Sequence, residues 1–398
     1  MKKNISKRFL CVFLAVSLFL LAGCAKTGQE APSSNESQKE EQGSNTKDNT
    51  KDDKPETESD GSVSGEKDGD SKEPDTEGYA GRDYTDIILD RSLVEGKLAV
   101  YFLRSDIRYS SYTGSSKGGD SVLLIAPDGT TMLYDCSTAL NAAYIVYAMQ
   151  RLGITKLDYF VNSHPHVDHL GGFSLIAEYF EIGQVYMPPT EEAYMTPTNE
   201  GGLPVVMMNT IKEKGIPYSC LVEGDQFQFG SDITVKVYNP PADLTFDGAV
   251  VNENEWSLAL KFIYKDSSVL LAGDCGNNEA KLGRATENEM VAKYGSELQA
   301  DVAKMNHHGD GKATKAGSAG WIDAVNAKLY VGMSTEVTDE TQFFTYMSKG
   351  AKALHTGIDG TVLVYTTGDG SYEVQTEQER YTDYFGSSKA VDGHLTIR

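Results

Sequence analysis

One ten-residue segment, residues 163–172, constrains the fold of this chain more than any other feature of its sequence. It reads Ser-His-Pro-His-Val-Asp-His-Leu-Gly-Gly and follows the apolar run 157–162, which is typical of a buried strand. Residues 173–180 have the pattern of a helix. Imidazole and carboxylate groups bind zinc, manganese and iron, and alternate side chains in a turn can converge. The segment therefore predicts a metal site, with the candidate ligands His164, His166, Asp168 and His169.

Two later segments end apolar strands in further residues that can bind metal. Residues 270–274 end in Asp274, and residues 302–309 contain His307 and His308. Because α/β enzymes bind ligands where strand ends meet, we expect Asp274 and one of these histidines to join the site. The alternatives are a turn or capping role for Asp274, and a structural or solvent-exposed role for one histidine.

The chain from residue 89 onwards is predicted to be one α/β domain, residues 89–398. Strand-like and helix-like patterns alternate there without internal repeats or a second low-complexity linker. The pattern predicts a strand over 98–103, a hairpin over 121–134 and a helix over 139–152. The cysteines of this part are Cys136, Cys220 and Cys275, an odd number that leaves at least one free thiol within a single chain. Cys275 follows Asp274 and is interpreted as packed beneath the site, with a soft metal ligand as the alternative.

The pattern His-x-His-x-Asp-His-x-Gly-Gly, followed by Gly273-Asp274 and a later histidine, resembles the metallo-β-lactamase superfamily. More narrowly, the sequence resembles the hydrolase domain of ComEC-family competence proteins, without that family's membrane channel. The segments that carry this resemblance are 119–121, 134–135, 273–274, 307–309 and 359–361. The resemblance covers about residues 98–370 and implies an αββα metallo-β-lactamase sandwich with a two-metal site at one edge.

The resemblance also implies a role for each matching residue. The implied ligands are His164 and His166 for one ion, Asp168 and His169 for the other, and Asp274 between the two. His307 is the implied last ligand, with His308 as the alternative. Asp120 and Asp135 are implied to support the ligands from behind.

The sequence departs from the superfamily at one ligand, because no histidine lies between His169 and His307. Asn254 or Glu253 would occupy the position of the missing histidine. Replacing nitrogen by oxygen shifts the preference from zinc towards manganese. The expected cofactor is one or two divalent ions, Zn or Mn.

The resemblance and the missing histidine favour a phosphodiesterase in which a metal-activated hydroxide attacks the ester. Asp168 would orient or deprotonate the water, and His308 or a tyrosine would donate to the leaving group. The expected substrate is an extracytoplasmic phosphodiester, either DNA or an envelope ester such as teichoic acid. The net charge of residues 81–398 is −17, which disfavours extended duplex binding without a basic groove. The loop 104–117 carries Arg104, Arg108, Lys117 and tyrosines, and is either a phosphate-contacting loop or an ordinary surface loop.

Three other interpretations compete with this one. In one of them the metal is purely structural, although structural sites are usually closed and rich in thiolates. A lactam or thioester hydrolase would normally need the missing histidine. A non-catalytic module that binds DNA or cell wall would have no need for a nearly complete set of ligands.

The first 88 residues are predicted to export and anchor the protein. Residues 1–23 have a basic start, an apolar run and small residues before Cys24, as in a lipoprotein signal peptide. Lipid on Cys24 would anchor the protein outside the cytoplasm on the bacterial cell membrane. Residues 24–88 are rich in Asp, Glu, Ser, Thr and Gly, and this composition is typical of a disordered linker.

Overall fold

The computed structural model describes residues 85–106, 109–110, 116–189, 202–246, 249–250, 252–378 and 394–397. All of them belong to the compact unit Lys72–Arg398. The predicted signal peptide, Cys24 and nearly all of the predicted linker lie outside the described residues. Among the helices of the described residues, none is long and apolar enough to cross a membrane.

Nine described strands form the first sheet, which is antiparallel at one side and parallel from β5 to β8. In spatial order they are β20 (His394–Ile397), β19 (Tyr372–Thr376), β18 (Val362–Thr366), β1 (Leu98–Phe102), β4 (Val122–Ile125), β5 (Thr131–Tyr134), β6 (Lys156–Val161), β7 (Glu181–Met187) and β8 (Tyr218–Cys220). The predicted strand 98–103, hairpin 121–134 and strand 157–162 correspond to β1, β4–β5 and β6.

Seven described strands form the second sheet, which is parallel from β14 to β17 and antiparallel elsewhere. In spatial order they are β17 (Lys352–His355), β16 (Leu329–Gly332), β15 (Val302–Lys304), β14 (Ser267–Leu271), β13 (Ala259–Tyr264), β10 (Ile233–Asn239) and β9 (Gln226–Phe229). Two small two-stranded sheets pair β2 (Tyr109–Ser110) with β3 (Ser116–Lys117), and β11 (Thr245–Phe246) with β12 (Ala249–Val250).

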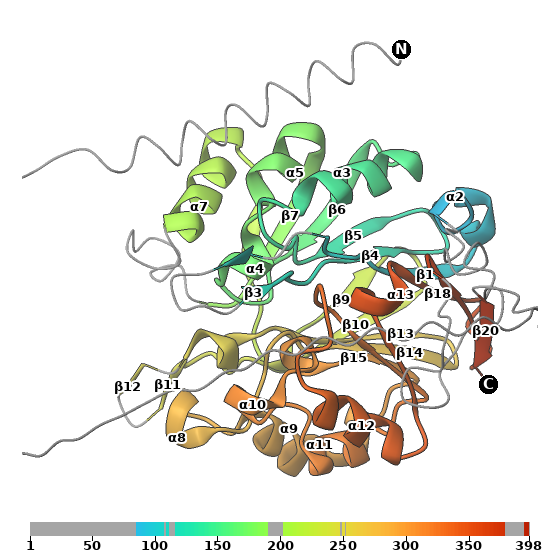
Figure 1. The fold of residues 1–398 in the computed structure, drawn as a ribbon. Helices are drawn as coiled ribbons and strands as arrows, with labels where there is room; N and C mark the ends of the chain where they lie inside the picture. Colours follow the sequence, from blue (N-terminus) through green and yellow to red (C-terminus); the bar gives the residue numbers. More distant parts are fainter. Residues whose placement is uncertain are drawn as a thin grey trace, which may run out of the picture. The chain divides into compact units, whose positions relative to one another are not determined.

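Helices cover the outer face of each sheet (Figure 1). On the first sheet they are α3 (Ala142–Arg151), α5 (Phe173–Tyr179) and α7 (Leu203–Lys214); on the second, α9 (Thr286–Tyr294), α11 (Ala319–Val325) and α12 (Glu340–Ser348). The shorter helical segments are α2 (Thr85–Ile88), η2 (Arg91–Val94), α4 (Val167–Leu170), η4 (Glu253–Trp256), α8 (Glu279–Leu282), η5 (Gly295–Leu298), η6 (Asn306–Gly309), α10 (Gly311–Thr314) and α13 (Thr356–Asp359).

The core lies between the two sheets, and both faces of the central strands are buried. In β1, Leu98, Val100 and Phe102 pack with residues of the second sheet. The alternate residues Ala99 and Tyr101 pack instead in the cluster beneath α3, α5 and α7. Alternation of this kind is expected for a strand with one side chain in two on each face. The layer order is therefore helix, sheet, sheet, helix, which confirms the predicted αββα sandwich.

Candidate metal centre

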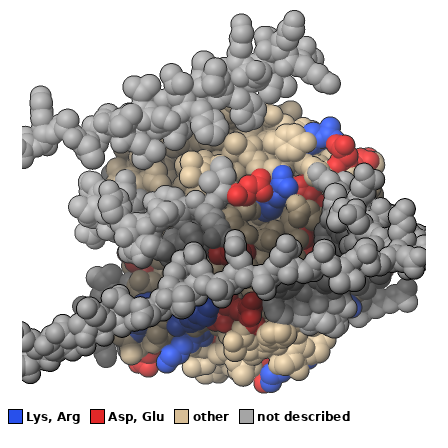
Figure 2. Space-filling model, in the orientation of Figure 1, with Lys and Arg blue, Asp and Glu red and all other residues tan. Residues whose placement is uncertain are grey.

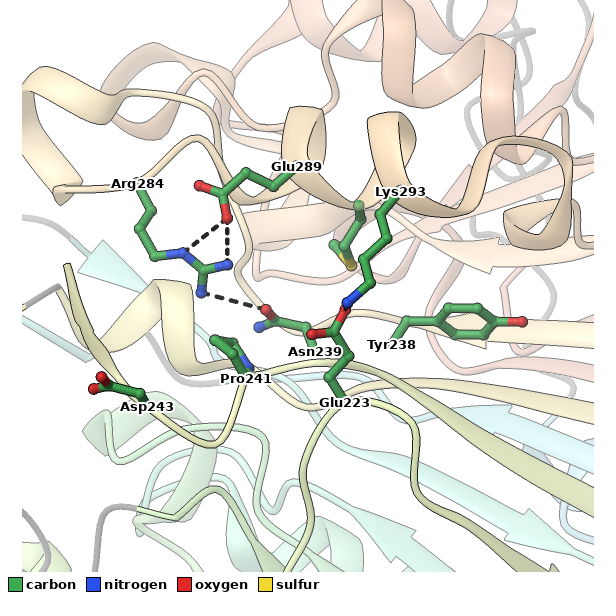
Figure 3. A pocket seen from close by; sticks show the side chains of 9 residues that line it. Glu223, Tyr238, Asn239, Pro241, Asp243, Arg284, Glu289 and Lys293 are labelled. Atoms are coloured by element: carbon green, nitrogen blue, oxygen red, sulfur yellow. Dashed lines mark hydrogen bonds and ion pairs between the residues drawn. The ribbon is translucent and has the colours of Figure 1, made fainter.

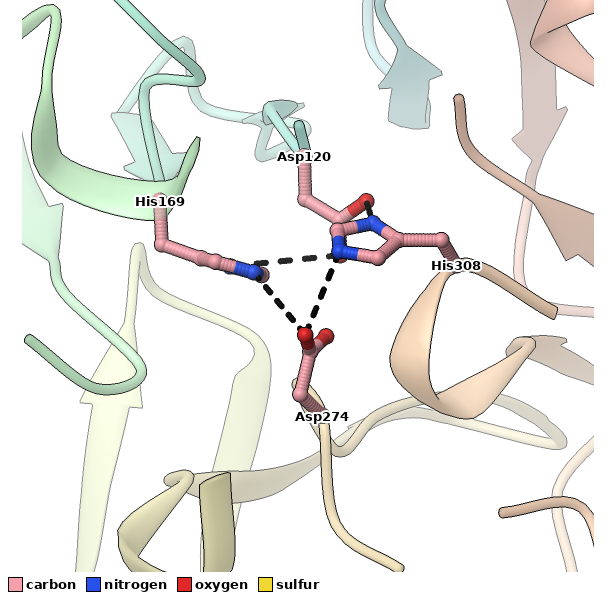
Figure 4. A group of neighbouring side chains, drawn as sticks. All are labelled: Asp120, His169, Asp274 and His308. Carbon is pink, nitrogen blue, oxygen red and sulfur yellow. Dashed lines mark hydrogen bonds and ion pairs between the residues drawn. The ribbon is translucent and has the colours of Figure 1, made fainter. Parts of the chain in front are cut away.

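Four buried side chains from both sheets bring a metal-ligating atom within 4.8 Å of one another (Figure 4). They are Asp120, His169, Asp274 and His308. Asp120 immediately precedes the β4 hairpin and His169 lies in α4, whereas Asp274 and His308 follow β14 and β15 of the second sheet. The group therefore forms where strand ends of the two sheets meet.

One ring nitrogen of His169 contacts Asp135, and the other is directed at Asp274. Its Nδ1 lies 2.8 Å from Asp135 Oδ2, and its Nε2 lies 3.2 Å from Asp274 Oδ2. Asp135 is itself fixed, because it accepts from the backbone N–H of Ser163 at 2.7 Å and from the Ser163 hydroxyl at 2.7 Å. A carboxylate behind an imidazole is the arrangement that orients histidines for metal binding.

His308 repeats this arrangement from the opposite sheet. Its Nδ1 lies 2.8 Å from Asp120 Oδ1. Its Nε2 lies 3.2 Å from Asp168 Oδ2 and 3.2 Å from Asp274 Oδ2, yet among the described residues this buried nitrogen has no hydrogen-bond partner. Asp120 belongs to the group by distance, but its contacts place it behind His308. The inward-facing set is Asp168, His169, Asp274 and His308.

His164 and His166 form a second pair beside this set. His164 Nε2 lies 3.0 Å from His166 Nδ1, and the His164 ring lies 4.1 Å from the His169 ring, centroid to centroid. The opposite nitrogen of His164, Nδ1, lies 2.9 Å from Ser163 Oγ and 3.3 Å from Ser257 Oγ. The two nitrogens of the pair thus converge, as they would around one shared cation.

The two candidates for the missing histidine have different surroundings. Glu253 Oε2 lies 3.8 Å from Nε2 of His166, the nitrogen that faces away from His164. Glu253 is therefore placed behind His166, as Asp135 is behind His169. Asn254 is buried, and its Oδ1 has no hydrogen-bond partner among the described residues. An unpartnered buried oxygen is costly, so Asn254 Oδ1 suits a site that a cation completes.

His307 and His308 diverge although they are adjacent in sequence. His307 Nδ1 contacts the backbone oxygen of Asp310 at 2.8 Å, and His307 is not a member of the buried group. Both residues have left-handed backbone, with φ of 48° and 62°. Of the two alternatives, His308 is the one that the structure brings to the acids.

Two glycines permit the close approach of the segments that carry these side chains. Gly119 has φ +84°, and a Cβ there would collide with the backbone oxygen of Asp168, which accepts from the N–H of Asp120 at 3.0 Å. Gly273 has φ +53°, and a Cβ there would lie 2.6 Å from Ser257 Oγ. L side chains rarely adopt such backbone angles, so glycine is needed next to both Asp120 and Asp274.

Without metal, the neighbouring acids raise the pKa of His169 and His308, so these two histidines are protonated. Burial acts to lower the pKa of His308, but Asp120 and Asp274 raise it to about 10. Burial likewise opposes protonation of His169, yet Asp274, Asp135 and Asp168 raise its pKa well above the usual range. His164 behaves in the opposite way: burial, followed by His169 and His166, lowers its pKa well below the usual value. Positive charge is thus held between the acids, where a divalent cation would fit.

Lys304 and Ser257 contact these residues and were not identified from the sequence. Lys304 ends β15 with a fully buried side chain, and its Nζ lies 2.5 Å from Asp120 Oδ2. The one available indication was a lysine within an otherwise apolar strand. Cys275 is buried and free, and its Sγ is 3.8 Å from the backbone oxygen of Ser257, as expected for a residue packed beneath the site. Cys136 is also free and buried.

Arg104, in the predicted phosphate-contacting loop, is engaged by protein groups. Its Nη1 lies 3.4 Å from Glu377 Oε1, its Nε lies 3.2 Å from Asp106 Oδ1, and its guanidinium stacks over the Tyr144 ring. Arg108 lies outside the described residues, and the side chain of Lys117 is not described. The described part of this loop therefore resembles an ordinary surface loop.

A cavity of about 240 Å³ lies beside α9 and is lined by none of the candidate ligands (Figure 3). Four of its charged side chains are paired, Arg284 with Glu289 and Lys293 with Glu223. Asn239 on its wall donates to the backbone oxygen of Ser257 at 2.8 Å. This hydrogen bond holds the segment before β13 in place. The residues that line the cavity supply none of the ligand atoms described above.

Comparison with known proteins finds a family match that includes His164, His166, Asp168, His169 and Asp274. Residues 117–281 match the family model described as the metallo-beta-lactamase superfamily. Among curated proteins, none matches the sequence significantly.

The matches to this chain also include three solved structures of low sequence identity. The metallo-beta-lactamase fold protein YhfI from Bacillus subtilis is 11% identical, with a TM-score of 0.39 over 65% of this chain and 96% of that chain. A metallo-beta-lactamase from Cronobacter sakazakii is 17% identical, with a TM-score of 0.34 over 51% and 76% of the two chains. The subclass B3 enzyme MEM-A1 from a soil metagenome library is 15% identical, with a TM-score of 0.34 over 53% and 81%.

Proposed function

Because residues 117–281 match the model of the metallo-beta-lactamase superfamily, we propose that this protein is a metal-dependent hydrolase and that it cleaves phosphodiesters. The observation that carries the proposal is the common arrangement of four histidines. Each has one ring nitrogen near a supporting oxygen, and its other nitrogen points inward. The supporting residues are Ser163 for His164, Glu253 for His166, Asp135 for His169 and Asp120 for His308.

The inward nitrogens and the carboxylates of Asp168 and Asp274 are suited to hold one or two divalent ions. His164 and His166, with the Asn254 oxygen, would hold one ion; Asp168, His169 and His308 would hold the other, and the Asp274 carboxylate would be available to both. Adjacent divalent ions supply a water of lowered pKa and stabilise both the attacking and the leaving oxygen of an ester. The oxygen-containing set at the first position favours Mn over Zn there.

The side chains of the chain itself supply positioning and proton transfer. Asp168 has 18% of its side chain exposed, more than His169, Asp274 or His308, so it is the one that solvent reaches. It would orient the attacking water and accept its proton. His308 has only 1% of its side chain exposed and its Nδ1 is held by Asp120, which favours a ligand role over donation to a leaving group.

The proposed substrate is an extracytoplasmic phosphodiester, DNA or a teichoic-acid-like envelope ester, reached by a domain anchored through lipid on Cys24. Support comes from the sequence of residues 1–24 and from the absence of a third histidine between His169 and His307. In the visible part of Figure 2, Lys and Arg side chains lie beside Asp and Glu side chains. Mixed charge of this kind suits a small ester better than an extended duplex.

Turnover of bis-p-nitrophenyl phosphate by the full chain, with Zn or Mn added, tests this function. We expect hydrolysis that falls more than 100-fold in the double variant Asp168→Ala/His169→Ala, because both substitutions remove inward-facing groups. Asp301→Ala is the matched control, since Asp301 is a carboxylate of the second sheet whose contacts are Ser268, Lys328 and Tyr372.

The competing functions give different results in the same experiment. Turnover of nitrocefin or acylglutathione, without phosphodiester cleavage, would show a lactam or thioester hydrolase. Bound metal with binding of DNA or cell wall, but no turnover of any of these substrates, would show a binding module.

A further inference from the structure

Lys304 is a buried ammonium next to the metal centre. Its side chain is 0% exposed, and its Nζ lies 2.5 Å from Asp120 Oδ2, whose side chain is also 0% exposed. The ammonium also donates to the backbone oxygens of Gly273 at 2.9 Å and Met305 at 3.1 Å. Burial of a charge is costly unless it is paired and hydrogen-bonded, so these contacts stabilise the lysine where it is.

The contacts of Lys304 connect the two sheets behind the ligand set. Asp120 precedes β4 of the first sheet, whereas Lys304 ends β15 of the second. Asp120 uses one oxygen for Lys304 and the other for His308 Nδ1, at 2.8 Å. The lysine also lies 3.6 Å from Asp274 Oδ1. A single ammonium therefore contacts the support of His308 and lies close to Asp274.

Lys304 is not placed to react with a substrate. Its side chain has no exposed surface, and three protein oxygens lie within 3.1 Å of its Nζ, one for each ammonium proton. Its influence must pass through the residues that it touches.

We propose that Lys304 is a positioning residue of the metal centre, which acts through Asp120 to hold the His308 ring with Nε2 directed at Asp168 and Asp274. Without the ammonium, Asp120 would be a buried carboxylate free to turn away from His308, and the ring would lose its fixed orientation. The inference rests on the ligand set of the proposed function, but it is tested by metal affinity and needs no hydrolysis.

A direct electrostatic effect would have the opposite sign. A positive charge so close to a bound cation repels it, and that repulsion is strong where water is excluded. If repulsion dominated, removal of Lys304 would tighten metal binding. If positioning dominates, removal weakens it.

A double-mutant cycle separates these roles, with zinc affinity of the full chain measured by competition with a chromophoric chelator. We expect Lys304→Met to weaken zinc binding by about 10- to 100-fold, the usual effect of losing an outer-shell partner. In the Asp120→Asn background, where the carboxylate that relays the effect is gone, Lys304→Met should change affinity by less than about threefold. In the zinc-loaded chain, the ring nitrogens of His308, followed by ¹⁵N NMR, should show one metal-bound nitrogen and one N–H in the wild type, and a mixture of states in Lys304→Met.

Lys328→Met is the matched control, because Lys328 pairs with Asp301 at 2.9 Å in the same sheet and touches no candidate ligand. If Lys304→Met does not fold, Lys304→Leu replaces it in the cycle, since its side chain also has no group that donates to Asp120.

Unchanged or tighter zinc binding, or an equal loss in both backgrounds, would overturn the proposal. If the wild-type protein binds zinc but hydrolyses no ester, the role of Lys304 stands while the proposed function fails. If the wild-type protein binds no zinc, both are overturned.

Discussion

Replacing His308 with alanine is expected to weaken metal binding by more than about 100-fold and to abolish metal-dependent hydrolysis. Loss of an outer-shell partner alone costs about 10- to 100-fold in affinity, and this substitution removes an inward-facing nitrogen itself. His308 Nε2 lies 3.2 Å from two of the carboxylates that would share the ion, so no described neighbour can replace it. Plasma mass spectrometry of the purified full chain measures the effect.

His307→Ala is the matched control, because His307 belongs to the same turn but points to the backbone oxygen of Asp310. Its metal affinity should stay within about threefold of the wild type, as for substitutions away from a site. Circular dichroism establishes that both variants fold. Equal losses in the two variants, or a larger loss in His307→Ala, would contradict the ligand set described here.

Metal binding is also expected to release protons and to strengthen steeply with pH. Without metal, His308 has a pKa of about 10 and His169 a pKa well above its usual value, so both are protonated at pH 7.5. An ion must displace those protons because only the neutral imidazole binds metal. We expect about two protons released per ion at this site, and about a 100-fold gain in affinity per pH unit.

Calorimetric titration with zinc in two buffers of different ionisation enthalpy counts these protons. In His308→Ala the count should fall to about one, whatever affinity remains. Binding without proton release, or with an affinity that is flat between pH 6 and 8, would contradict the protonated state of the metal-free centre.

The raised pKa of His308 also predicts how the stability of the metal-free protein depends on pH. The pKa of His308 is raised on folding, so its stabilising contribution is complete below the unfolded value of about 6.5. That contribution is lost as the pH rises towards the folded value of about 10. The melting temperature of the metal-free chain should therefore fall over this range, while added metal should offset the fall.

Much of the fold could be predicted from sequence because its elements have strong local patterns. The predicted helix 139–152 contains α3, and the predicted strands 98–103 and 157–162 match β1 and β6 to within one residue at each end. The ligand segment 163–172 was identifiable because several metal-ligating side chains fall together in sequence. Asp274 was identifiable because it follows an apolar strand.

The remaining features depend on contacts between distant segments. Adjacent histidines look alike in sequence. The left-handed backbone that directs His308 towards the acids and His307 away from them is set by tertiary packing. Asn254 or Glu253 was expected in the ligand position, and the place of Glu253 behind His166 depends on how η4 approaches α4. Lys304 lies in an apolar strand, and its partner Asp120 is 184 residues away in the chain.

X-ray absorption at the metal edge, measured on the full chain loaded with zinc or manganese, tests the metal centre most directly. We expect bound metal with a mixed shell of imidazole nitrogens and carboxylate oxygens and no sulfur, because Cys275 is packed beneath the site rather than among the inward atoms. A shell without imidazole, or a purified chain that takes up no divalent metal, would contradict the account.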